Sequence, residues 1–239
     1  MNNRQEKLLT HIVEDYIKTA TPVGSDYLVR NYKLDVSGAT VRNDCQVLEK
    51  EGYLTQPHIS AGRIPTKKGY KRYLNSRSIA GNSKQKNNLL ISKESKQLEK
   101  VYKSTKLQDQ SRQVKSLAKA LAELAQGAVL VGFNKRDVYY TGLSYLFAQP
   151  EFQNLDLVYN IGAVVDHLDE VIEEIYDEVT YEVTVKIGGD NPFSTDCSFI
   201  SFKFKQDNTY KMVGILGPMR MPYLENIDRL EYVKQLLSI

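Results

Sequence analysis

The fold of the first part of this chain is decided by the stretch SGATVRNDCQVLEKEG, residues 37–52. Ser37 precedes an apolar-periodic run and is a residue type that caps helix N-termini, whereas Gly52 suits the position just after a helix. Val41, Cys45 and Leu48 recur at helical spacing, which predicts one buried face. The polar residues of the first turns are then expected to face outward.

Two further helices are expected before this stretch. Residues 3–19 have the apolar spacing of one buried helix face, which is made by Leu9, Ile12, Val13, Tyr16 and Ile17. Thr21-Pro22 is expected to end that helix. Ser25 is then expected to cap a short helix that runs to Asn31, with apolar positions at Tyr27, Leu28 and Tyr32.

A small hairpin is expected after Gly52. Residues 53–56 and 63–65 are short extended segments, and residues 57–62 form a turn-rich tip between them. Thr66 is then expected to cap a short helix through Leu74. Three helices followed by a hairpin is the order of a winged helix-turn-helix, so residues 1–75 are predicted to be a DNA-binding domain of that kind.

The helix that starts at Ser37 is the expected reader of the DNA major groove, because its polar side chains are exposed while its other face is buried. Arg42 suits a guanine edge, and Asn43 or Gln46 suits adenine. The alternative is an ordinary amphipathic helix with a polar outer face, to which a residue such as Asp44 belongs.

Further DNA contacts are expected at the start of this helix and around the hairpin tip. Ser37 and Thr40 are placed for phosphate contacts, and Gly38 lets a DNA backbone approach closely. The tip can lie along the DNA backbone or reach into the minor groove, and the polar side chains around it are His58, Ser60, Arg63 and Lys67. A solvated loop is the alternative interpretation of this segment.

Charge is distributed unevenly along the chain. The formal net charge of +3 combines +11 over residues 1–126 with −8 over residues 127–239. A basic half can neutralise phosphates, whereas an acidic half is repelled by them. This asymmetry favours a polyanionic partner for the first half, with a solvated face and a charged linker as the alternative.

The middle of the chain, residues 76–126, is expected to connect two domains. Residues 76–96 are rich in Ser, Asn and Lys, which is typical of a linker. Residues 97–126 are expected to be helical, with an apolar stripe made by Val114, Leu117, Ala118, Leu121, Leu124 and Ala125. This stripe can pack on the following domain or on a second copy of the chain, and the pattern favours neither.

The sequence pattern of residues 127–239 predicts a third segment, which contains both strands and helices. The candidate strands are residues 128–133, 138–141, 181–187, 197–205 and 210–216, the last two being joined by a turn at Asp207-Asn208. One helical stripe runs from Ile161 to Ile175, and another from Ile227 to Leu237. The predicted fold class is therefore α+β, with a mixed sheet covered by helices.

Enzyme, metal and membrane functions are not favoured. Cys45 and Cys197 lie far apart and form neither a disulfide framework nor a metal site. The three histidines have no nucleophile or metal-ligand spacing beside them. No run approaches the roughly 18 apolar residues of a membrane span, and the N-terminus lacks the apolar core of a secretory signal. We therefore expect a cytoplasmic protein that is not an enzyme, needs no cofactor and has no membrane partner.

Several stretches of this sequence together resemble the HrcA family of bacterial heat-inducible transcription repressors. In the first 75 residues the matching stretches are TPVGS at 21–25, SGATVRND at 37–44, GYL at 52–54, QPH at 56–58 and SAGRIPT at 60–66. Matches in the second half follow in the family's order, among them GLS at 142–144, QPEF at 149–152 and GILGP at 214–218.

The resemblance implies more than the residues themselves do. It implies a GAF-like C-terminal domain over residues 127–239 and a homodimer on double-stranded operator DNA. The operator, called CIRCE, is an inverted repeat that lies ahead of chaperone operons of the groE and dnaK type. The resemblance also implies regulation by a GroEL-type chaperonin. Family members usually carry a dimerising segment inserted in the GAF-like domain, whereas residues 133–142 leave no room for it here.

A different class of function remains open beside repression of heat-shock genes. A sheet with a covering helix can hold a small-molecule pocket, so the alternative is a winged-helix regulator that senses a ligand in its C-terminal domain.

Overall fold

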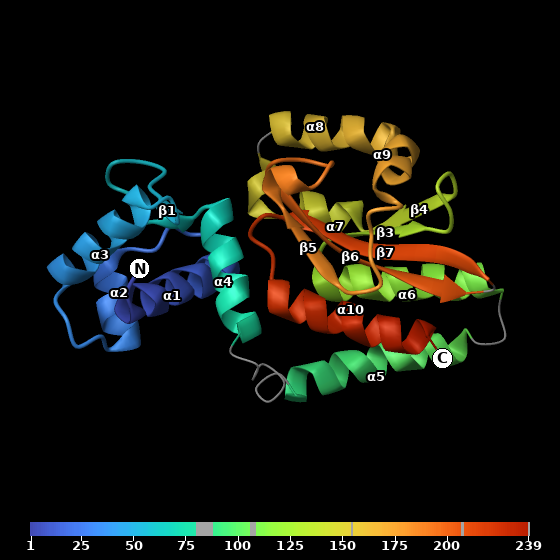
Figure 1. Cartoon of the computed structure of the whole chain (residues 1–239), viewed down its shortest axis with the longest axis horizontal. Helices are drawn as coiled ribbons and strands as arrows, with labels where there is room; N and C mark the ends of the chain where they lie inside the picture. The colour runs from blue at the N-terminus through green and yellow to red at the C-terminus, as the bar shows by residue number, and fades with distance from the viewer. Residues whose placement is uncertain (80–87, 106–108, 154, 207, 239) are drawn as a thin grey trace. The chain divides into compact units, whose positions relative to one another are not determined.

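A computed structural model describes residues 1–79, 88–105, 109–153, 155–206 and 208–238. The chain forms two compact units, Met1–Ser83 and Lys84–Ile239 (Figure 1). The expected domain limits at residues 75 and 126 stay predictions.

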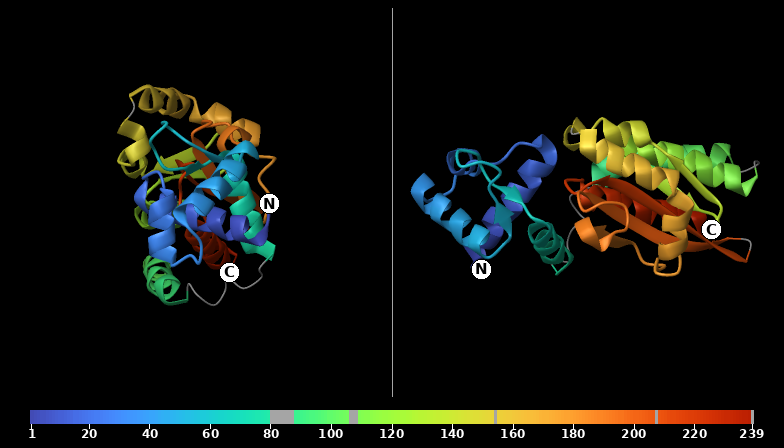
Figure 2. Two further views of the ribbon diagram at one scale, coloured as in Figure 1. Left: turned by 90° about the vertical axis from the view of Figure 1, so that its left-hand side faces the viewer. Right: turned by 90° about the horizontal axis from the view of Figure 1, so that it is seen from above.

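Three helices form the first part of unit 1. They are α1 (Asn3–Thr19), α2 (Ser25–Tyr32) and α3 (Gly38–Lys50), and they contact one another and a small hairpin (Figure 2). The bounds of all three helices were predicted from the sequence to within about one residue, because helix caps and apolar spacing are local signals. For example, Asn2 and Gln5 form a reciprocal capping box at the start of α1, with both bonds at 2.9 Å.

Two details of α2 differ from the prediction. Gly24, and not Ser25, occupies the N-cap position, where no side chain completes the cap. Leu28 is fully buried as expected, whereas Tyr27 is 43% exposed. Adjacent residues of a helix point about 100° apart, and in α2 it is Leu28 that faces the core while Tyr27 is turned toward solvent.

The hairpin consists of β1 (Leu54–Thr55) and β2 (Ile64–Pro65), which pair antiparallel. Helix α4 (Lys67–Ile79) follows, and the Thr66 hydroxyl accepts the Gly69 N–H at 3.2 Å, which confirms Thr66 as its cap. The helix runs beyond the predicted end at Leu74. Its extension is held to α1 by an ion pair between Arg77 and Glu14.

Unit 2 is built on a five-stranded antiparallel sheet in the order β4-β3-β7-β6-β5. The strands are β3 (Ala128–Gly132), β4 (Val138–Thr141), β5 (Thr184–Ile187), β6 (Cys197–Gln206) and β7 (Thr209–Pro218). The long β6–β7 hairpin turns where predicted, with Gln206 opposite Thr209 and Asn208 at a left-handed φ of 59°. Asp207, the other predicted turn residue, lies outside the described residues. The fold class is α+β, as expected, but the predicted mixed sheet was wrong. Every pair of neighbouring strands is antiparallel, and the helical segments do not link parallel strands of this sheet.

Helices cover both faces of this sheet (Figure 1). On one face lie α6 (Gln110–Ala125) and α10 (Tyr223–Leu237), with α5 (Asn88–Ser104) packed against both. On the other lie α7 (Leu143–Phe147), α8 (Leu155–Asp166) and α9 (Leu168–Ile175), which share a buried core with Leu130, Phe199 and Met212. The short helices η2 (Pro150–Gln153) and η3 (Gly188–Asp190) complete the unit.

The apolar stripe of α6 packs on β3 within the same unit, so Val114, Leu117 and Leu121 are buried in a single chain. Of the two possibilities left open by the sequence, the structure therefore shows packing on the sheet. Residues 133–137 alone join β3 to β4, which agrees with the expected lack of an insertion there.

Three predictions for residues 76–239 were wrong in detail. Of the predicted linker at 76–96, residues 76–79 belong to α4 and residues 88–96 to α5, whereas residues 80–87 lie outside the described residues. Tertiary contacts such as the ion pair from Glu94 to Arg229, at 2.8 Å, hold α5 in place. The stripe from Ile161 to Ile175 is divided into α8 and α9 at His167, and both helices reach the same core. Strand β5 starts at Thr184 instead of Tyr181.

Candidate nucleic-acid interface

Helix α3 presents a polar outer face. Arg42, Asn43 and Gln46 are exposed, whereas Val41 and Leu48 are buried at 2% and 0% exposure. Ser37 caps the helix, since its hydroxyl accepts the Thr40 N–H at 3.2 Å and lies 3.0 Å from the Thr40 hydroxyl. The two predicted phosphate contacts are therefore bonded to each other and organise the first turn of α3.

Asp44, which the sequence assigned to the polar outer face, instead lies on the inner side of α3 and anchors this helix to α1. Its carboxylate accepts hydrogen bonds from Arg4 at 2.7 Å and from Gln5 at 3.2 Å. The hydrogen bond from Arg4 is the main cause that holds the pKa of the Asp44 carboxyl below its ordinary value. The buried charge is thus paired, and it fixes the direction in which the outer face of α3 points.

The loop at residues 56–63, which we call the wing loop, is held in one shape by Gln56. The side-chain amide of Gln56 donates to the carbonyls of Ile59 and Ala61, both at 2.8 Å. The Ala61 N–H also donates to the His58 carbonyl at 2.9 Å. His58, Ile59 and Ser60 are exposed on this ordered loop.

The base of the wing loop is attached to two other parts of unit 1. Arg63 and Val23 exchange two backbone hydrogen bonds of 2.9 Å, which bind the loop to the α1–α2 connection. Gly62 permits this approach, since a Cβ there would lie 2.4 Å from the Val23 carbonyl carbon. The Arg63 guanidinium pairs with Glu49 of α3 at 3.1 Å, and its side chain is only 15% exposed.

A cleft of about 640 Å³ separates α3 from the wing loop. Three arginines line it, Arg30, Arg42 and Arg63, together with polar groups such as Gln46 and one carboxylate, that of Asp26. Guanidinium groups are suited to phosphate, so a mostly polar cleft of this kind can hold a nucleic-acid backbone.

The structure brings some of the sequence-predicted residues together and leaves others apart. Arg42, Gln46, Ser60 and Arg63 line the cleft, and Asn43 and His58 are exposed on the same two elements. Lys67 lies at the start of α4 and is not among the cleft residues. Gly38 faces Asp26, whose Oδ1 would lie 2.5 Å from an added Cβ, so its small size accommodates α2.

Sequence reasoning missed four residues of this region. Arg30 lines the cleft from α2, Gln56 shapes the wing loop, Ile59 forms its tip, and Gly62 lets it approach Val23. The only sequence signal was the unusual concentration of turn-forming residues at 57–62, which indicates a loop without showing what holds it.

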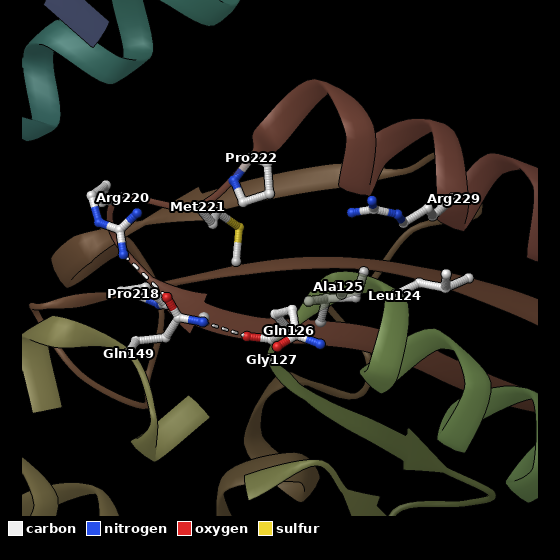
Figure 3. A pocket seen from close by; sticks show the side chains of 12 residues that line it. Leu124, Ala125, Gln126, Gly127, Gln149, Pro218, Arg220, Met221, Pro222 and Arg229 are labelled. Atoms are coloured by element: carbon white, nitrogen blue, oxygen red, sulfur yellow. Dashed lines mark hydrogen bonds between the residues drawn. The ribbon is translucent and has the colours of Figure 1, made fainter. Parts of the chain in front are cut away.

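A second cavity, of about 270 Å³, lies in unit 2 where α6, β7 and the start of α10 meet (Figure 3). Its walls are mostly apolar, with Met221 projecting between two arginines. Arg220 pairs with Glu151 at 2.6 Å, and Arg229 pairs with Glu94 of α5 at 2.8 Å. Both guanidinium charges are therefore already balanced inside the protein.

Among the helices that the structure describes, none has the length and apolar character of a membrane-spanning segment. The same residues include no cluster of three or more His, Cys, Asp or Glu side chains arranged to bind a metal ion.

Comparison with known proteins identifies the family. The model of the HrcA protein C-terminal domain matches residues 70–227, which is more than half of the chain. The chain belongs to the HrcA family. The heat-inducible transcription repressor HrcA of Carboxydothermus hydrogenoformans is 27% identical over 333 aligned positions, which cover 100% of this chain and 97% of that protein.

Other HrcA relatives match over shorter stretches. The repressor of Acetivibrio thermocellus is 29% identical over 184 residues, 74% of this chain and 49% of its own length. That of Bifidobacterium animalis subsp. lactis is 54% identical over 77 residues, 32% of this chain and 21% of its own length. The Carboxydothermus alignment is longer than this chain of 239 residues, so that HrcA contains segments which this one lacks.

The fold also matches a solved structure. A crystal structure described as a hypothetical protein superposes with a TM-score of 0.82 at 21% identity and covers 100% of this chain and 98% of its own. At this identity the likeness concerns the fold alone.

Proposed function

We propose that this HrcA-family repressor reads double-stranded operator DNA through α3 and the wing loop, which together form a winged helix-turn-helix. The observation that carries the proposal is the polar cleft between them, lined by Arg30, Arg42 and Arg63. In this arrangement α3 lies in the major groove and a sugar-phosphate strand lies in the cleft.

The exposed residues of α3 supply base discrimination in this proposal. Arg42 reads a guanine edge, and Asn43 or Gln46 reads adenine. Ser37, Gly38 and Thr40 place the start of α3 against the DNA backbone, and His58, Ser60 and Lys67 contribute polar or charged groups around the wing loop. Arg63 acts mainly by positioning, since its guanidinium is bound to Glu49.

A titration of the full-length chain against operator and scrambled duplexes at several salt concentrations tests the proposal. We expect Arg42→Ala to weaken operator binding by about 1–3 kcal/mol and to relax base preference at one position. Arg136→Ala is a matched control, because Arg136 is an 85% exposed arginine in unit 2. Equal affinity of the unaltered protein for both duplexes would refute sequence-specific binding.

The operator is proposed to be the CIRCE inverted repeat ahead of groE- and dnaK-type operons, bound by a homodimer. An inverted repeat needs two reading helices in fixed relation. Because the apolar stripe of α6 is buried within the chain, another surface must supply the dimer contact. Sedimentation of the full chain with and without operator tests this, and a monomer in both cases would exclude the symmetric complex.

Unit 2 is proposed to be a GAF-like regulatory domain in a cytoplasmic protein, with a GroEL-type chaperonin as a partner. Its antiparallel sheet with helices on both faces is compatible with that fold. Co-sedimentation of the full chain with purified chaperonin, compared with chaperonin alone, tests the partnership.

A second candidate function is a small-molecule sensor, and the cavity between Arg220 and Arg229 favours it. Arg229 both lines this cavity and binds Glu94 on α5, so an occupant that altered Arg229 would act on the helix that follows unit 1. Native mass spectrometry of the purified chain tests this candidate. The absence of bound metabolite, together with unchanged melting across a metabolite panel, would count against it.

A further inference from the structure

Ile59 at the tip of the wing loop packs against none of the residues that the structure describes. The residue is 100% exposed, the highest value for a large apolar residue in the part of the chain that the structure describes. A β-branched apolar side chain gains nothing from full exposure to water. Such a residue at the end of a functional loop indicates a contact that forms only with a partner.

The loop holds Ile59 outward in an ordered way. The Ile59 carbonyl accepts the Gln56 amide at 2.8 Å, and the same amide binds the Ala61 carbonyl at 2.8 Å. The two backbone bonds between Arg63 and Val23, and the Arg63–Glu49 ion pair, hold the base of the loop. Little conformational entropy is then lost when the tip meets its partner, because the loop is ordered beforehand.

The position of the tip relative to α3 identifies the partner surface. Ile59 and Ser60 line the same cleft as Arg42 and Gln46 of α3. In a DNA duplex, one sugar-phosphate strand separates the major groove from the minor groove. If that strand occupies the cleft while α3 lies in the major groove, the tip of the wing loop lies over the minor groove.

We infer that Ile59 enters the minor groove as an apolar probe and adds to the base preference of the protein. The inference rests on the proposed DNA-binding function. In the minor groove a G·C pair presents the guanine 2-amino group, whereas an A·T pair presents only acceptors. An apolar side chain desolvates that amino group without a hydrogen bond in return, so Ile59 should disfavour G·C beneath it.

The experiment measures binding of the full chain to an inverted-repeat duplex taken from upstream of chaperone genes. Inosine replaces guanine at one position at a time, which removes the 2-amino group from the minor groove and leaves the major-groove edge unchanged. Ile59→Ser removes the probe, and Ile59→Leu keeps its apolar character. Tyr159→Ser is the control, because it removes another exposed large side chain, 78% exposed, from α8 in unit 2.

We expect Ile59→Ser to weaken binding about tenfold, in keeping with the burial of one isoleucine side chain. The dependence of affinity on salt should not change, because no phosphate contact is removed. Inosine should strengthen binding of the unaltered protein at the pairs beneath the tip, and this gain should disappear in Ile59→Ser but persist in Ile59→Leu and Tyr159→Ser.

Three results separate the failure of this inference from the failure of the DNA-binding proposal. If the unaltered protein discriminates operator from scrambled duplex and Ile59→Ser binds equally well, the apolar probe is refuted and Ile59 serves another partner. The same holds if the inosine gain is identical in both proteins. If the unaltered protein does not discriminate between the duplexes at all, the DNA-reading function itself is refuted.

Discussion

Replacement of Gly62 by alanine should detach the wing loop from the rest of unit 1. An added Cβ would lie 2.4 Å from the Val23 carbonyl carbon, 2.5 Å from the Val23 oxygen and 2.7 Å from the Pro22 carbonyl carbon. All three atoms are backbone, so the two segments must move apart instead of a side chain rotating away. The movement breaks the two Val23–Arg63 hydrogen bonds of 2.9 Å.

The magnitude follows from those two bonds and from the strain. Each hydrogen bond contributes about 0.5–1.5 kcal/mol, and a forced overlap costs about 1–3 kcal/mol. The lost hydrogen bonds and the overlap strain do not simply add, because moving the segments apart breaks the bonds but relieves much of the strain. We therefore expect Gly62→Ala to lower the local stability of the wing loop by about 2–3 kcal/mol.

Amide hydrogen exchange of the full-length chain measures this effect at the bonds themselves. The Val23 and Arg63 amides should exchange about 30–100 times faster in Gly62→Ala, since each 1.4 kcal/mol corresponds to tenfold. Gly24→Ser is the matched control, because an added Cβ at Gly24 meets nothing within 4 Å. Unchanged protection of both amides in Gly62→Ala would refute the close approach of the two segments.

Three further predictions concern the elements that hold the candidate interface. Gln56→Ala should weaken operator binding about tenfold while thermal unfolding stays unchanged, because the wing loop must then be ordered on binding. Equal affinity of both proteins in a titration would show that Gln56 does not preorganise the wing loop for DNA. Asp44→Asn should cost about 1–3 kcal/mol in urea unfolding, since Arg4 loses its ion pair with a mostly buried carboxylate. Because the pKa of Asp44 is lowered in the folded protein, its contribution to stability is present above the usual carboxyl pKa and is lost as the pH falls through the lowered folded-state pKa. The Asp44→Asn variant should therefore flatten the acid limb of the stability profile. Burial lowers the pKa of His11, which stacks on Tyr32 at 3.7 Å and faces Lys7, Glu14, Asp15 and Arg77. The unfolded chain therefore binds a proton at His11 more readily than the folded protein does, and stability should fall as the pH drops below about 6.5. Melting curves between pH 7.5 and 5 should show a smaller loss of stability for His11→Gln. An identical pH dependence in both proteins would contradict a role for His11 in this loss.

Local patterns in the sequence were sufficient for much of unit 1. The spacing of Val41, Cys45 and Leu48 predicted which face of α3 is buried, and Thr66 was correctly placed at the start of α4. These signals succeed because caps and the 3.6-residue period depend on residues a few positions apart. The same reasoning failed for residues 88–96, where the stabilising partner is Arg229, far along the chain.

The candidate interface shows a similar division. Arg42, Asn43 and Gln46 were predictable as outward-facing residues, because the outer face of a helix follows from its inner one. Gln56 and Gly62 were not, because their importance lies in contacts with Ile59, Ala61 and Val23 that no periodic pattern displays.

The sequence by itself determined the order of helices and hairpin in unit 1, the outward face of α3 and the HrcA family of the chain. Only the tertiary structure decided three other points: that α6 buries its stripe on β3, that Arg63 is bound to Glu49, and that Ile59 lies exposed across a cleft from Arg42. The physical reason is range. Helix periodicity and capping are set by neighbours in sequence, whereas a cleft exists only when segments distant in sequence are brought together by hydrogen bonds, ion pairs and buried apolar surface.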